Sequence, residues 1–167
     1  MIRVLVVDDH PLFRDGLAGL LATVDDVEVV GAVEDGETAV RRCAELAPDV
    51  VLMDLNMPGA NGIELTALIR EQETHAHTPI VFLSGESSED LQFDAIDAGG
   101  DDFLSKPIRP RHLISAVQTR VRRHRQQESR RARLPEKDAA TGLVYRKTLL
   151  EQLDACLHGG QQAGGAK

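Results

Sequence analysis

The chain has 167 residues, 42% of them hydrophobic, and a formal net charge of −8, which suits one globular domain with a short appendage. The charge is divided unevenly, because residues 1–119 carry a net −14 and residues 120–167 a net +6. An acidic first part argues against nucleic-acid binding and suits a cation site. No apolar run approaches the roughly 20 residues of a membrane span, and no signal-peptide pattern is present, so we expect a cytoplasmic protein.

Five β-strands are predicted from short β-branched and apolar runs that stop at polar or turn-forming residues. They cover residues 2–7, 27–33, 50–54, 79–84 and 102–106. Between the strands, apolar residues recur at the three- and four-residue spacing of helices. The first helix begins at Pro11 and has an apolar face of Leu12, Phe13, Leu17, Leu20, Leu21 and Val24. The second follows Asp35 and Gly36 and has a face of Ala39, Val40, Cys43, Ala44 and Ala47.

The remaining helices are predicted by the same spacing and by their end signals. One covers residues 63–73, with Ile63, Leu65, Leu68 and Ile69 as its apolar positions. The next begins at the capping residues 87–90 and ends before Gly99 and Gly100. The last begins at Pro110 and has a face of Leu113, Ile114, Val117 and Val121. This alternation predicts an α/β fold, a doubly wound, flavodoxin-like sheet of five parallel strands in the order 2-1-3-4-5.

The composition changes after Arg120. Residues 120–133 contain seven arginines and one acidic residue, and the apolar spacing of the last helix stops at Val121. Because no aromatic residues are interleaved with the arginines, we interpret this stretch as a solvated helical extension and not as a nucleic-acid-binding surface. A second helical pattern follows in residues 138–157, and residues 158–167 are rich in Gly, Gln and Ala.

Polar residues stand where four of the predicted strands end. Asp8 and Asp9 follow the first strand, and Asp54 ends the central one. Ser84 and Lys106 end the fourth and fifth strands. The carboxyl ends of parallel strands share one edge of the sheet, where open α/β sheets bind their ligands, so we expect these five side chains to converge.

This set of side chains suits phosphoryl transfer to an aspartate. Crowded carboxylates raise one another's pKa and stay ionised readily only around a hard cation such as Mg²⁺. The metal and the ammonium of Lys106 would neutralise the oxygens of the transferring group while Asp54 attacks the phosphorus. We therefore predict a magnesium-dependent phosphorylation site.

Four stretches resemble the receiver domain of two-component response regulators. They are residues 6–10, 53–59, 83–85 and 103–108, which read VVDDH, MDLNMPG, LSG and FLSKPI. The resemblance covers about residues 1–120. It implies a signalling phosphoprotein that catalyses only its own phosphorylation and dephosphorylation. Its phosphoryl donor would be a sensor histidine kinase or the phosphotransfer protein of a phosphorelay.

The resemblance also implies the roles of the site residues. Asp54 is the phospho-acceptor, and Lys106 contacts the phosphoryl group. Mg²⁺ is bound by the carboxylates of Asp9 and Asp54 and by the backbone carbonyl of Asn56. Asp8 reaches the metal through a water molecule.

A conformational switch is implied in the same way. Ser84 moves to hydrogen-bond the phosphoryl group, Phe103 turns into the vacated space, and the peptide bond before Pro107 is cis. Asn56 and Glu86 are placed to touch the attacking water, as in rapidly dephosphorylating chemotaxis receivers. We expect the face formed by the fourth helix, fifth strand and fifth helix to bind a partner or a second copy of the chain.

Residues 138–147 are similar to the opening of a diguanylate cyclase (GGDEF) domain, with departures at Ala140 and Tyr145. The similarity implies an output related to cyclic di-GMP, although that family's catalytic loop is absent from this sequence. We therefore divide the chain into three parts. They are a receiver domain at residues 1–120, a basic helical linker at 121–137, and a short helical segment with a tail at 138–167, as the start of a truncated GGDEF domain.

Two other functions stay open on sequence alone. A stand-alone short receiver would act through protein–protein interaction without an output domain. A haloacid-dehalogenase-type phosphatase also uses an Mg²⁺-assisted aspartate nucleophile. Its pattern has a second aspartate two residues after the nucleophile, however, where this chain has Asn56. Steady turnover of small phosphate esters would distinguish the phosphatase from a receiver.

Overall fold

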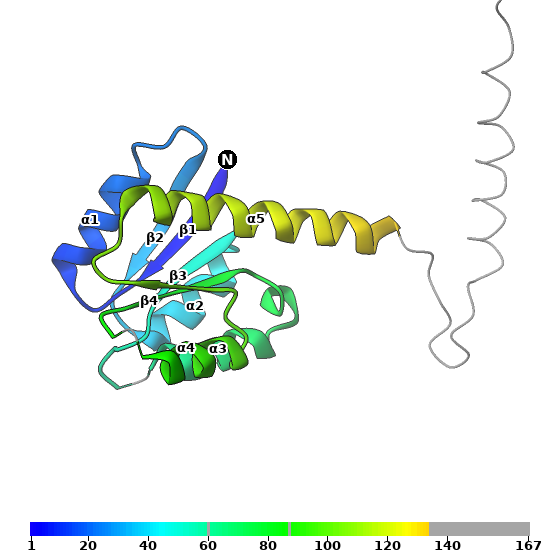
Figure 1. Ribbon diagram of the computed structural model, residues 1–167. Coiled ribbons are helices and arrows are strands. Elements are labelled where there is room, and N and C mark those ends of the chain that lie inside the picture. The colour runs from blue at the N-terminus through cyan, green and yellow to red at the C-terminus, as the bar shows by residue number, and fades with distance from the viewer. Residues whose placement is uncertain (60, 87, 134–167) are drawn as a thin grey trace, which may run out of the picture. The chain divides into compact units, whose positions relative to one another are not determined.

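The computed structural model describes residues 1–133 except Ala60 and Ser87, and a parallel sheet forms its centre (Figure 1). The strands are β1 (Ile2–Val7), β2 (Val27–Val33), β3 (Val50–Asp54), β4 (Ile80–Ser84) and β5 (Asp102–Ser105). All neighbouring strands pair in parallel, in the order β2-β1-β3-β4-β5. The predicted flavodoxin-like architecture and its strand order are therefore confirmed.

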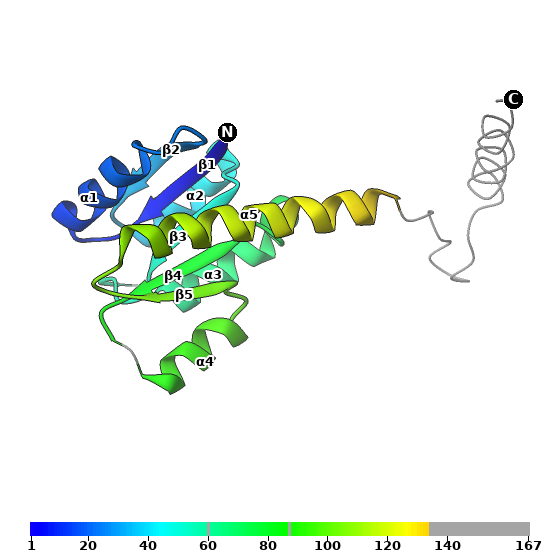
Figure 2. The ribbon, with the colours of Figure 1, turned by 45° about the horizontal axis from the view of Figure 1, so that its top comes forward.

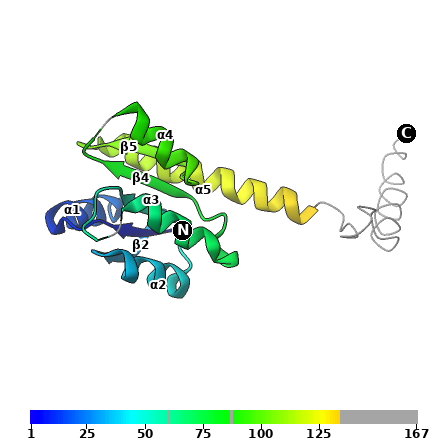
Figure 3. The same ribbon diagram turned by 90° about the horizontal axis from the view of Figure 1, so that it is seen from below.

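Helices cover both faces of the sheet, as Figures 2 and 3 show. The helices are α1 (Pro11–Leu21), α2 (Gly36–Leu46), α3 (Gly62–Glu71), η1 (Glu73–His75), α4 (Glu89–Asp97) and α5 (Pro110–Arg133). One core cluster joins the sheet to α2, α3 and α4, and the other joins it to α1 and α5. Strands β3 and β4 are buried along their whole length because both of their faces are covered.

The first turn of α1 differs from the prediction. Leu12 was expected on the apolar face, but it is 90% exposed. The buried Leu17 stands five positions after Leu12 in the helix, which places the two side chains about 140° apart around the helix axis. Val24 follows the end of α1 and still packs against the cluster on the α1 and α5 side.

The apolar faces of α2 and α3 are narrower than predicted. Ala44 is exposed, and Ala47 lies beyond α2, where it caps the helix with a left-handed φ of 41°. Leu46, which the predicted face omitted, packs against the core instead. In α3, Leu68 is 48% exposed, and the helix ends at Glu71 instead of residue 73.

Helix α5 continues to Arg133, so the expected helical extension is present. Residues 1–126 form one compact unit, and the described residues of the second unit are the last turns of this helix. The predicted segment at residues 138–167, with its GGDEF-like motif, lies outside the described residues. Among the helices of residues 1–133, none has both the length and the apolar character needed to cross a membrane.

Two glycines give a matched test of this packing. A Cβ on Gly62 would lie 2.5 Å from the backbone oxygen of Asp54, whereas a Cβ on Gly19 in α1 would meet nothing within 4 Å. Gly62→Ala should therefore lower the free energy of unfolding by about 1–3 kcal/mol, and Gly19→Ala should raise it by about 0.5–1 kcal/mol. Urea denaturation checks both values, and a Gly62→Ala protein as stable as wild type would contradict the packing at the end of β3.

Candidate functional site

Three charged side chains meet at the carboxyl edge of the sheet. Asp8 follows β1, Asp54 ends β3, and Lys106 follows β5. The Lys106 Nζ lies 2.8 Å from Asp8 Oδ2 and 3.2 Å from Asp54 Oδ1. Asp8 is fully buried and Asp54 is 2% exposed, so their charges have little access to water. The sequence prediction that these residues converge agrees with this geometry.

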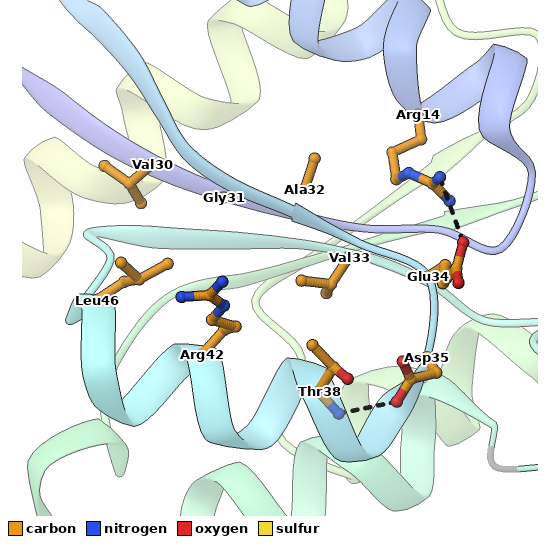
Figure 4. Close-up of a pocket in the computed structure, with 10 residues that line it drawn as sticks. All are labelled: Arg14, Val30, Gly31, Ala32, Val33, Glu34, Asp35, Thr38, Arg42 and Leu46. Atoms are coloured by element: carbon orange, nitrogen blue, oxygen red, sulfur yellow. Dashed lines mark hydrogen bonds and ion pairs between the residues drawn. The ribbon is translucent and has the colours of Figure 1, made fainter.

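The loop after β1 fixes Asp8 through its neighbours. The backbone N–H of His10 donates a hydrogen bond of 2.8 Å to Asp8 Oδ1. From α1, Arg14 donates one of 2.8 Å to the Asp8 backbone carbonyl and lies 3.5 Å from the carboxylate of Glu34. Arg14 and Glu34 both line a separate cavity of about 360 Å³ between β2 and α2 (Figure 4). Arg14 thus ties the position of Asp8 to the end of β2.

The acidic residues form a cluster with the donor atoms of a metal site. Asp8, Asp9, His10 and Asp54 each offer a ligand atom, and these atoms lie within 4.8 Å of one another. Asp9 Oδ1 is buried and has no hydrogen-bond partner among the described residues. The His10 Nδ1 atom lies 3.0 Å from it, at ion-pair distance. Sequence reasoning assigned no role to His10, although it directly follows the two aspartates.

Burial controls the ionisation of Asp54. Loss of water around the carboxyl raises its pKa, and the negative charge of Asp8 acts in the same direction. The positive charge of Lys106 and its hydrogen bond lower the pKa, but they do not reverse the effect of burial. Ionised Asp54 is therefore held at an energetic cost, which a further cation at the cluster would reduce.

The other predicted site residues lie around this centre. The Ser84 hydroxyl, at the end of β4, accepts a hydrogen bond of 3.0 Å from the backbone N–H of Glu86. Phe103 is half-buried and packs against the core cluster on the α2, α3 and α4 side. Asn56 and Glu86 are exposed. The peptide bond before Pro107 is cis.

Lys106 has an aromatic neighbour whose contact with it was not predicted from the sequence. Phe13, in the first turn of α1, places its ring centroid 4.1 Å from the Lys106 Nζ. Helical spacing had identified Phe13 only as a core residue, and it does pack against the cluster on the α1 and α5 side. The periodic pattern could not reveal the lysine contact, because that contact depends on where the loop after β5 returns.

Comparison with known families decides the class of this site. A family model described as "Response regulator receiver domain" matches residues 4–118. The chain belongs to the response regulator receiver family. The match begins within β1, covers the other four strands, and ends within α5, three residues before the core residue Val121. Members of this family are signalling modules, which agrees with the predicted class.

Two relatives differ in how much of their length the match covers. The "Transcriptional regulatory protein LiaR" of Bacillus subtilis is 39% identical over 117 residues, which are 70% of this chain and 54% of LiaR. A 76.5 kDa protein of Thiocystis violacea is 35% identical over 163 residues, which are 98% of this chain and 23% of that protein. The chain thus spans about half of one relative and about a quarter of the other.

Two solved structures resemble the fold closely. The receiver domain of the Pseudomonas aeruginosa sensor histidine kinase PA1611, with magnesium in its active-site cleft, is 28% identical. It covers 72% of this chain and 97% of its own, with a TM-score of 0.66. The receiver domain of a modulated diguanylate cyclase from Desulfovibrio desulfuricans is 25% identical. It covers 76% of this chain and 98% of its own, with a TM-score of 0.68.

The raised pKa of Asp54 predicts a pH-dependent gain in stability on its replacement. The pKa of Asp54 is higher in the folded chain than in the unfolded chain. The free energy of unfolding therefore falls as the pH rises from the unfolded-state pKa to the folded-state pKa. Asp54→Asn should therefore raise the urea midpoint at pH 7.5, and the gain should shrink as the pH falls toward 4. The exposed Asp15 provides the control substitution Asp15→Asn, which should leave the midpoint unchanged. A pH-independent effect of Asp54→Asn would contradict this account.

Proposed function

We propose that this chain accepts a phosphoryl group on Asp54 and converts it into a change of protein association. The main support is the Lys106 ammonium, 3.2 Å from a buried carboxylate at the end of the central strand. An Asp54 oxygen attacks the phosphorus of a phosphohistidine on a kinase or phosphotransfer protein. The P–N bond breaks, and its electron pair returns to the leaving imidazole. Lys106 balances charge on the phosphoryl oxygens.

The acidic cluster fits Mg²⁺, the ion predicted from the sequence. Carboxylate and carbonyl oxygens suit this ion, and Asp9 Oδ1 is a buried oxygen without a hydrogen-bond partner in the described part of the chain. Asp9, Asp54 and the Asn56 carbonyl would hold the ion, with Asp8 acting through water. Bound Mg²⁺ supplies positive charge that offsets the phosphoryl oxygens. Without it, Lys106 is the nearest cation to both buried carboxylates among the side chains that the structure describes.

Ser84 and Phe103 are proposed to transmit the phosphorylation of Asp54 to the protein surface through changes in their own positions. The Ser84 hydroxyl accepts a backbone hydrogen bond and still has its own O–H to donate, so turning toward Asp54 would let it hydrogen-bond a phosphoryl oxygen. Phe103 lies on the neighbouring strand, in register with Phe82, two residues before Ser84. Its movement would alter the surface formed by α4, β5 and α5. On α4, Phe93 (68%) and Ile96 (46%) are exposed apolar side chains, which favours the use of this helix in self-association or partner binding.

The lifetime of the phosphorylated form is proposed to be short. Asn56 and Glu86 are both exposed and follow Asp54 and Ser84 at a distance of two residues. Their polar side chains could therefore orient a water molecule for attack on the phosphoryl group. We expect a lifetime of seconds to minutes.

The proposed output is related to cyclic di-GMP. The match to the 76.5 kDa relative covers 98% of the chain and therefore continues past the receiver, into the stretch that resembles a GGDEF domain. The similar receiver from a diguanylate cyclase favours the same reading. We retain the division into a receiver at residues 1–120, a linker at 121–137 and a GGDEF-like start at 138–167. A transcriptional output, as LiaR has by its name, is the second candidate, because LiaR is 39% identical over 117 residues of this chain.

Phosphate incorporation tests the proposed function. Wild-type protein incubated with acetyl phosphate and Mg²⁺ should gain a single phosphate that hydroxylamine removes, because an acyl phosphate is cleaved by this nucleophile. Asp54→Asn should gain none, since its amide cannot attack the phosphorus. Intact-mass spectrometry before and after hydroxylamine treatment measures both outcomes.

The controls separate the roles of the cluster residues. Omission of Mg²⁺ or the substitution Asp9→Ala should slow labelling by at least about tenfold while the protein stays folded, because charge neutralisation of the phosphoryl oxygens is weakened. Asp15→Asn should label like wild type. Equal labelling of wild type and Asp54→Asn would refute the assignment of the acceptor.

A further inference from the structure

The Lys106 ammonium has a third neighbour besides its two carboxylates. Asp8 Oδ2 lies at 2.8 Å, Asp54 Oδ1 at 3.2 Å, and the centroid of the Phe13 ring at 4.1 Å. The Lys106 side chain is only 18% exposed, so these three groups replace most of the water that would surround it. The carboxylates belong to strand ends, whereas the ring belongs to α1.

The face of an aromatic ring attracts a cation, and the attraction grows when water is excluded. A lysine side chain has four flexible carbons, so an ammonium held only by carboxylates can follow either of them. Phe13, in contrast, packs against the core cluster that joins α1 and α5 to the sheet. Its ring is therefore a fixed surface against which the ammonium can rest.

We infer that Phe13 is a positioning residue for phosphoryl transfer, acting through Lys106 and not through contact with the phosphoryl group. This inference rests on the proposed function. When Asp54 shares an oxygen with phosphorus, Lys106 loses part of its attraction to that carboxylate and must stay near the phosphoryl oxygens. The ring of Phe13 keeps the ammonium from turning toward solvent, and so holds the positive charge where negative charge gathers.

The competing explanation is that Phe13 only fills space beneath α1. An apolar side chain of similar size would then serve equally well, and its replacement would change stability but not the reaction. The two explanations differ in whether the ring face matters, and whether its effect passes through Lys106. Both differences can be measured.

The test is a double-substitution cycle on the rate of phosphate incorporation from acetyl phosphate with saturating Mg²⁺. Phe13→Leu keeps the apolar bulk and removes the ring, and should slow incorporation by about fivefold to tenfold. Phe13→Tyr keeps the ring face and should retain most of the rate. In a Lys106→Met background, Phe13→Leu should change the remaining rate by less than about twofold, because the ammonium is already gone.

Leu20→Ala is the matched control, since Leu20 also lies on α1 and packs against the same core cluster, but its side chain has neither a charge nor a ring to attract the ammonium. It should lower the urea midpoint while the incorporation rate stays within about twofold of wild type. Phe13→Met replaces Phe13→Leu should the latter fail to fold.

The outcomes are distinguishable. An unchanged rate for Phe13→Leu in the wild-type background, or an equal slowing in the Lys106→Met background, would overturn the inference and leave the proposed function standing. A wild-type protein that incorporates no phosphate would refute the proposed function, and this inference with it.

Discussion

A single ammonium between two buried carboxylates is the interaction on which the site depends. Asp8 and Asp54 lie at the ends of adjacent strands and are almost completely buried, so without a counter-ion their repulsion would add to the cost of their burial. Lys106 supplies the counter-charge from the far side of β4, because β5 ends at the same edge of the sheet. The burial that makes Asp54 costly to ionise also keeps water from competing for its partners.

This constraint agrees with the close packing around the charged centre. β3 and β4 are buried on both faces, and Gly62 lets the start of α3 approach the backbone of Asp54 more closely than a side chain would permit. Arg14 holds the Asp8 backbone, and Phe13 lies against the lysine from the same helix. Asn56 and Glu86 differ from the charged centre because both are exposed to water. A buried charged centre next to exposed polar side chains suits a reaction whose product must also be removed by water.

The strand order could be predicted from the regular alternation of strand and helix patterns. The convergence of Asp8, Asp54 and Lys106 could be predicted because each of these residues lies at the end of a distinct apolar run. The parallel topology then places those ends at one edge. Leu12 and Ala44 were misassigned because helical spacing does not define how wide the buried stripe is, and the sheet covers only part of each helix. Phe13 lies on α1 and Lys106 in the loop after β5, so no local sequence pattern could indicate their contact. The output is hardest to predict from these residues, because the match leaves about half of one relative and three quarters of the other uncovered.

A crystal structure of the protein with Mg²⁺ and beryllofluoride, a mimic of the phosphoryl group, would test the central claim most directly. Our account predicts that the Lys106 ammonium leaves Asp54 Oδ1, contacts a fluorine atom of the mimic, and keeps its contacts with Asp8 and the Phe13 ring. The Ser84 hydroxyl should release the Glu86 N–H and turn toward the mimic. A structure in which Lys106 remains away from the bound mimic would contradict the claim that this ammonium organises phosphoryl transfer to Asp54.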